Sequence, residues 1–167
     1  MTEPMHPEIE FEHDDFDLAT IEDEIRVDES CQSLLKRFYQ DLQVCGYTAQ
    51  RASDLAYSAD FYLRDYLLDF ARQNVVRPQP GIVRRFAATW FITRTLDPEI
   101  SALERHLEGI RELYRYLHRQ HLISADELAF IEAEADQTEY YRQRIESFLA
   151  ISGDGYIAWE EQCPLRG

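Results

Sequence analysis

The feature that most constrains the fold is a run of apolar residues between positions 100 and 117. They recur at intervals of three and four, at Ile100, Leu103, Leu107, Ile110, Tyr114 and Leu117. This spacing places all six on one side of an α-helix, whereas a half-buried β-strand would alternate at every second residue. Asp97, Pro98 and Glu99 come just before the run and suit a helix cap, its first position and its first turn. We therefore expect a long amphipathic helix with one buried face.

The same periodicity predicts four further helices, which span about residues 33–45, 49–73, 81–95 and 125–150. Gly46 suits the end of the first of these, and Thr48 suits the cap of the second. Ser124 and Glu127 have the spacing of a capping box and open the last. We predict an all-α fold, a single bundle of about five helices, and leave a short strand or a turn open for residues 156–159.

Charge is segregated along the chain, whose formal net charge is −15. Residues 1–30 carry a net charge of −11, residues 31–125 carry +3, and residues 126–167 carry −7. The acidic overall charge disfavours contact with nucleic acid, whereas the mildly basic centre taken alone permits it.

We divide the chain into an acidic N-terminal arm, residues 1–30, and a helical domain, residues 31–167. The arm is expected to be a partly disordered, solvated tail, because charged blocks of one sign repel themselves. The alternative is that its scattered apolar residues let it dock on a basic surface of this chain or of a partner. In the helical domain, residues 124–151 form an extra acidic helix and residues 152–167 a C-terminal segment.

Two features predict where the protein resides. No apolar stretch approaches the roughly 18–20 residues of a membrane span. The first residues lack the basic and apolar regions of a secretory signal, so we expect a cytoplasmic protein without contact to a membrane.

Cys31, Cys45 and Cys163 are odd in number and form no C-x-x-C pair, which argues against a disulfide framework and a zinc ribbon.

Motifs of enzymes and cofactor sites are missing from the sequence. There is no Walker loop, no G-x-G-x-x-G and no G-x-S-x-G. His118 and His121 lie three apart on a predicted helix and could share a metal ion, but a third ligand is not near them in sequence. We therefore expect no enzyme, no cofactor and no metal site.

Arginine dominates the basic residues of the central part of the chain. Its planar guanidinium suits bidentate contact with phosphate better than lysine does. The candidates for contact with DNA phosphates are Arg64, Arg72, Arg105, Arg111, Arg115 and Arg119. The alternative is ordinary pairing on helix surfaces, for which Glu108–Arg111 and Glu112–Arg115 have the right spacing.

Short motifs along the centre occur in an order known from one family of helical domains. They are LLKRFY at 34–39, GYT at 46–48, AYSADFYL at 56–63, VRRF at 83–86, RHLEGIRELYRYL at 105–117 and LI at 122–123. Residues 31–123 thus resemble the N-terminal SAM-like (core-binding) domain of tyrosine recombinases and phage integrases. The resemblance implies a helical bundle that holds one side of duplex DNA. The family's Asn-Pro linker, its His-x-x-Arg box and its catalytic domain are absent, which implies a stand-alone module that does not cleave DNA.

The function expected from the sequence is that of a non-catalytic, DNA-associated helical module, with autoinhibition by the acidic arm as one option. The alternative is an acidic helical protein that binds other proteins or acts as a regulatory DNA mimic. Candidate partners are accordingly duplex DNA and a basic protein.

Overall fold

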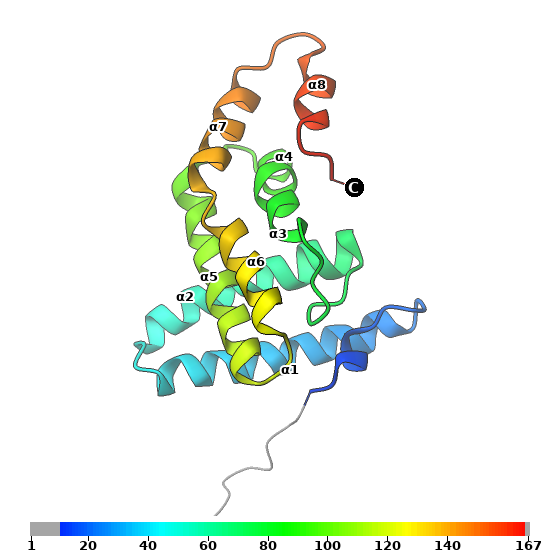
Figure 1. Cartoon of the computed structure of the whole chain (residues 1–167), viewed down its shortest axis with the longest axis vertical. Coiled ribbons are helices and arrows are strands. Elements are labelled where there is room, and N and C mark those ends of the chain that lie inside the picture. Colours follow the sequence, from blue (N-terminus) through cyan, green and yellow to red (C-terminus); the bar gives the residue numbers. More distant parts are fainter. Residues whose placement is uncertain (1–10, 166–167) are drawn as a thin grey trace, which may run out of the picture.

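The computed structural model describes residues 11–165, and this part of the chain folds into helices and turns only. The all-α prediction is confirmed. Several helical elements join end to end, so the described residues form seven continuous helices besides one short 3₁₀-helix, instead of about five. Figure 1 shows their arrangement. The difference arises at the C-terminal end, where one expected helix is divided and a further helix follows.

The first long helix, α1 (Asp23–Val44), begins well before the expected start at residue 33. Val27 and Cys31 are buried and continue the apolar face of the helix, but acidic neighbours hide this pattern in the sequence. A short 3₁₀-helix, η1 (His13–Phe16), precedes it, and its Phe16 is fully buried. The expected disordered tail is therefore corrected for residues 11–30, while residues 1–10 lie outside the described part. The proposed boundary at residue 30 falls inside α1.

The second helix consists of α2 (Ala49–Asp60) and the π-helical η2 (Phe61–Ala71), close to the expected bounds. The cap predicted at Thr48 is confirmed, because its hydroxyl accepts a hydrogen bond of 3.1 Å from the backbone N–H of Arg51. Gly46 ends α1 with a φ of +105°, a backbone conformation that glycine adopts at little cost.

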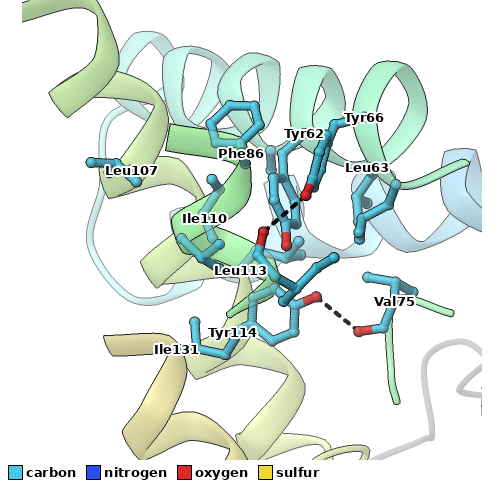
Figure 2. Close-up of a cluster of buried hydrophobic side chains, with 14 of the residues drawn as sticks. Tyr62, Leu63, Tyr66, Val75, Phe86, Leu107, Ile110, Leu113, Tyr114 and Ile131 are labelled. Carbon is cyan, nitrogen blue, oxygen red and sulfur yellow. Dashed lines mark hydrogen bonds between the residues drawn. The ribbon is translucent and has the colours of Figure 1, made fainter. Parts of the chain in front are cut away.

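An aromatic cluster fills the space between η2 and the following helix (Figure 2). Tyr62 meets Phe86 edge to face with ring centroids 5.1 Å apart, and Tyr66 meets Trp90 in the same way at 5.3 Å. Such pairs contribute beyond the apolar area that they bury. The Tyr114 hydroxyl donates a 2.9 Å hydrogen bond to the carbonyl of Val75, which holds the loop after η2 against the core.

The third helix joins α3 (Ile82–Arg85), η3 (Phe86–Trp90) and α4 (Phe91–Arg94). Its N-terminus is capped from another helix, because the buried carboxylate of Glu134 accepts hydrogen bonds from the N–H groups of Gly81 at 2.7 Å and Arg84 at 2.9 Å. Helix N-termini leave N–H groups unpaired, and a negative charge stabilises them. A side chain 50 residues away in sequence thus fixes where this helix starts.

The predicted apolar stripe lies on α5 (Ile100–Arg119), the central helix of the fold. Five residues of the stripe are buried as expected, namely Leu103, Leu107, Ile110, Tyr114 and Leu117, and Ile100 is half-buried. Leu113 and Tyr116 are buried as well. The helix starts one residue after Glu99, which takes the cap position that we assigned to Asp97.

Helices α2 and α5 cross in close contact at Gly109. A Cβ atom at this position would lie 2.6 Å from the Cβ of Ser58 and 2.8 Å from the carbonyl oxygen of Leu55. These are distances that real Cβ atoms essentially never show. Only glycine therefore permits the two backbones to approach each other as they do.

The expected helix over residues 125–150 is two helices, α6 (Ala125–Ala135) and α7 (Thr138–Leu149). The capping box of Ser124 and Glu127 is present, as predicted. The break follows Ala135, and the Tyr141 hydroxyl bridges it with a 2.6 Å hydrogen bond to the carbonyl of Glu134. The apolar spacing alone gave no sign of it.

The C-terminal segment forms a short helix, α8 (Gly155–Glu161), and neither a strand nor a turn. Arg144, which is 2% exposed, fastens it by donating to the carbonyl oxygens of Ala88 at 2.9 Å and Trp159 at 2.6 Å. Its guanidinium also lies 3.8 Å from the ring centroid of Trp159. Desolvation lowers the pKa of Arg144, and the carbonyl oxygens and the indole ring take the place of a carboxylate partner.

We expect Gly109→Ala to destabilise the protein by about 1–3 kcal/mol, because an added methyl group must push the α2 backbone away. Urea denaturation followed by circular dichroism measures this loss. Gly155→Ala is the matched control, since a Cβ there would make only an ordinary contact of 3.5 Å with Ile151. Equal midpoints for the two variants would contradict the close crossing.

We also expect the three cysteines to differ sharply in reactivity. Cys45 is exposed, whereas Cys31 and Cys163 are buried. Burial, with a smaller contribution from Asp28, raises the pKa of the Cys31 thiol to about 12, so it holds almost no thiolate near pH 8. Iodoacetamide at pH 8 should label Cys45 alone in the native protein and all three cysteines in urea, as read by mass spectrometry. Rapid labelling of Cys31 in the native protein would contradict this packing.

Candidate functional site

The candidate site is the set of arginines that the sequence marks for phosphate contact. Five of the six form an ion pair with a carboxylate of this chain, and Arg105 has none among the described residues. The structure therefore places most of these side chains in the surface pairing that we considered as the alternative. The partners, however, come mostly from other helices instead of the same one.

Two of the arginines connect η2 to α1. Arg64 donates two hydrogen bonds to the carboxylate of Asp60 and lies 3.5 Å from a carboxylate oxygen of Asp28. Arg72, directly after η2, pairs with Glu24 near the start of α1. The hydrogen bond with Asp60 raises the pKa of Arg64, and the neighbouring carboxylates add to this effect. These side chains are about one third to one half exposed, which limits what each pair contributes to stability.

Three arginines on α5 pair in other directions. Arg115 bonds Glu132 on α6 at 2.6 Å and Glu112 on its own helix at 2.8 Å. The hydrogen bond to Glu132 is the main cause that raises the pKa of Arg115. Arg111 pairs with Asp136, directly after α6, and Arg119 pairs with Asp41 near the end of α1.

The ion pairs join five of the six arginines to carboxylates at separate places along the chain. Glu24 and Asp41, the partners of Arg72 and Arg119, lie 17 residues apart on α1, which is about 25 Å along the axis of a helix. The α5 arginines nearer its middle turn toward α6 instead. These ion pairs connect helices that are distant in the sequence.

Part of the acidic segment docks on the basic surface of the chain itself, which was one of our two expectations for the arm. Arg77 bonds Asp14 at 2.9 Å and lies 3.4 Å from Asp17. The amide of Asn74 donates a 2.6 Å hydrogen bond to Asp17. That bond, followed by the charge of Arg77, lowers the pKa of Asp17. Arg77 lies in the loop after η2, outside every predicted helix, so the helical periodicity of the sequence gave no reason to select it.

The arginines without an ion pair in the described part of the chain lie elsewhere. They are Arg84, Arg85, Arg94 and Arg105, together with the buried Arg144, which bonds backbone carbonyls. Three of them belong to the third helix, and the guanidinium of Arg94 lies over the rings of Phe70 and Trp90, at 5.3 and 5.5 Å from their centroids. The sequence shows that these residues are basic, but only the structure shows that no described carboxylate pairs with them.

Metal and membrane sites gain no support from the described residues. Between residues 11 and 165, no three His, Cys, Asp or Glu side chains are placed to hold a metal ion. Every helix in that range is too short or too polar to cross a bilayer.

Burial, with a smaller effect of Arg105, lowers the pKa of His106, whose ring contacts those of Phe61 and Phe91.

Comparison with known proteins assigns no family to this arrangement. The chain matches no model of a protein family, no curated protein and no solved structure.

Proposed function

We propose that this protein is a helical interaction module that binds a basic partner through its carboxylate surface. The observation that carries this proposal is the pairing of the central arginines with carboxylates of the same chain. Those pairs cancel the positive charge that made the centre a candidate for phosphate contact. The excess of carboxylates in a chain of charge −15 then dominates the field around it.

A row of carboxylates along α2 and η2 gives this surface a definite location. Asp65 and Asp69 are exposed and form no ion pair in the described structure. Desolvation raises the pKa of Asp65, and the charges of Asp69 and Asp60 raise it further. Repulsion among these groups costs stability in the free protein, and a cationic partner would relieve it.

A basic peptide or a lysine-rich protein segment is the partner of matching chemistry. Rim charges of this kind act mainly on the association rate, so binding should weaken as salt screens them. The protein is expected to act in the cytoplasm, and this stays a prediction from its sequence.

We expect Asp65→Asn/Asp69→Asn to weaken binding of a fluorescein-labelled oligolysine peptide by about threefold or more, on the scale of lost charge contacts. Fluorescence anisotropy over a salt series measures this. Glu146→Gln/Glu161→Gln is the matched control, because it removes from α7 and α8 two exposed carboxylates that form no ion pair with a described residue. Equal losses in both variants would show that net charge alone acts, and no peptide binding would contradict the proposal.

Binding to duplex DNA is a second candidate function. It is favoured by the unpaired arginines on the third helix and by Arg105, and by the resemblance of residues 31–123 to recombinase core-binding domains. In this case Asp14, Asp17 and Glu24 would act as autoinhibitory groups, since they already occupy Arg77 and Arg72. Deleting residues 1–30 is not a clean test, because it would remove the buried Phe16 and Val27.

Substitutions in the docked segment avoid that problem. If the DNA function holds, Asp14→Asn/Glu24→Gln should raise the affinity for a labelled 20-base-pair duplex, and Arg84→Gln/Arg105→Gln should lower it, with binding that falls steeply with salt. The same anisotropy assay reads both changes. No salt-dependent binding by any of the proteins would exclude this second candidate and leave the first unaffected.

A further inference from the structure

A concave pocket opens between the end of η2 and the start of α3. Its volume is about 480 Å³, which lies in the range of sites for small molecules. The side chains that define its chemistry are Tyr66, Phe70, Arg72, Gln73, Gln79 and Arg85. The proposed function does not use this pocket.

Among the described residues, both formally charged residues that line this pocket are arginines. In a chain with 32 Asp and Glu residues, a wall whose described side chains include no carboxylate is a distinct local environment. Arg72 is held by Glu24, but Arg85 is half-buried and has no ion pair among the described residues. A guanidinium in this position attracts an oxyanion and can bind it through two parallel hydrogen bonds.

The pocket also presents an aromatic wall and polar groups with spare capacity. Phe70 is partly buried and stacks on Tyr66, with ring centroids 6.1 Å apart and an angle of 21° between the rings. The side-chain amides of Gln73 and Gln79 make only long contacts of 3.4 Å, each to a nearby backbone carbonyl. Their oxygens and remaining N–H groups have no partner among the described residues and can contact the edge of a polar ring.

The backbone at the rim has an unusual conformation on both sides. Arg72 has a φ of +56°, which few residues other than glycine adopt, and it follows an 11-residue π-helix. On the other side, Gly81 has a φ of +95°, and the guanidinium of Arg85 lies 3.6 Å from where a Cβ at Gly81 would stand. Strained backbone and π-helical segments concentrate at functional sites, and here both border the same pocket.

We propose that this pocket binds a small molecule that carries a planar aromatic ring and an oxyanion, of about the size of a nucleoside monophosphate. Arg85 binds the phosphate or carboxylate group. Phe70 contacts the ring, and the amides of Gln73 and Gln79 bond its polar edge. Arg72 stays with Glu24 and adds positive potential at the rim.

The test is a titration of the full chain with adenosine 5′-monophosphate, benzoate, adenosine and inorganic phosphate, followed by tryptophan fluorescence. Trp90 reports on the pocket, because its ring centroid lies 6.3 Å from that of Phe70. We expect saturable binding of at least one of the two ring-bearing anions, and weaker binding of adenosine and of phosphate. Which anion binds distinguishes a phosphate ligand from a carboxylate ligand.

Arg84 and Arg85 provide a matched pair of variants. Both lack an ion pair, but Arg84 is exposed and does not line the pocket. Arg85→Met should weaken binding about tenfold or more, as the loss of a charged hydrogen bond does, while Arg84→Met should stay within about twofold. Phe70→Leu should remove the preference for a ring over phosphate alone. Absence of saturable binding to the unmodified protein, or equal losses in the two arginine variants, would overturn the proposal.

Discussion

The close contact between α2 and α5 at Gly109 is the constraint on which the rest of the structure depends. Because Gly109 has no Cβ, the two helices can meet backbone to backbone there, and Ser58 and Leu55 leave no room for any larger residue. This contact sets α5 in the centre, where its buried residues support α2 on one side and α6 on another. The aromatic cluster of η2 and η3 then closes the core beside this crossing (Figure 2).

Arginine has two separate roles in this protein. Arg72, Arg115 and Arg119 connect helices through exposed ion pairs that contribute little individually and leave the surface acidic. Arg144 is buried without a carboxylate partner in the described part of the chain, and backbone carbonyls together with the Trp159 ring hold it. Removal of such a buried group would cost far more than removal of any surface pair, because its bonding partners would be left unpaired.

Charge and pocket point to different kinds of ligand. The exposed row that contains Asp65 and Asp69 favours cations, whereas Arg85 favours an anion within a pocket whose described lining includes no carboxylate. Both features lie along η2, whose outer side carries the carboxylates and whose C-terminal end borders the pocket. A helix that serves two surfaces in this way could couple one ligand to the other only if binding shifts η2 itself.

Local sequence determined the helical class, the Thr48 and Ser124 caps, the end of α1 at Gly46 and the buried stripe of α5, because these depend on contacts within a few residues. It did not reveal the early start of α1, the break after Ala135 or the helix α8, where contacts with distant segments decide the outcome. The arginine candidates show the same division. Their positions on helices could be read from the sequence, but whether a guanidinium meets a carboxylate depends on which helices become neighbours. Only the tertiary structure decides that, since ion pairs such as Arg72–Glu24 and Arg119–Asp41 join residues 48 and 78 positions apart.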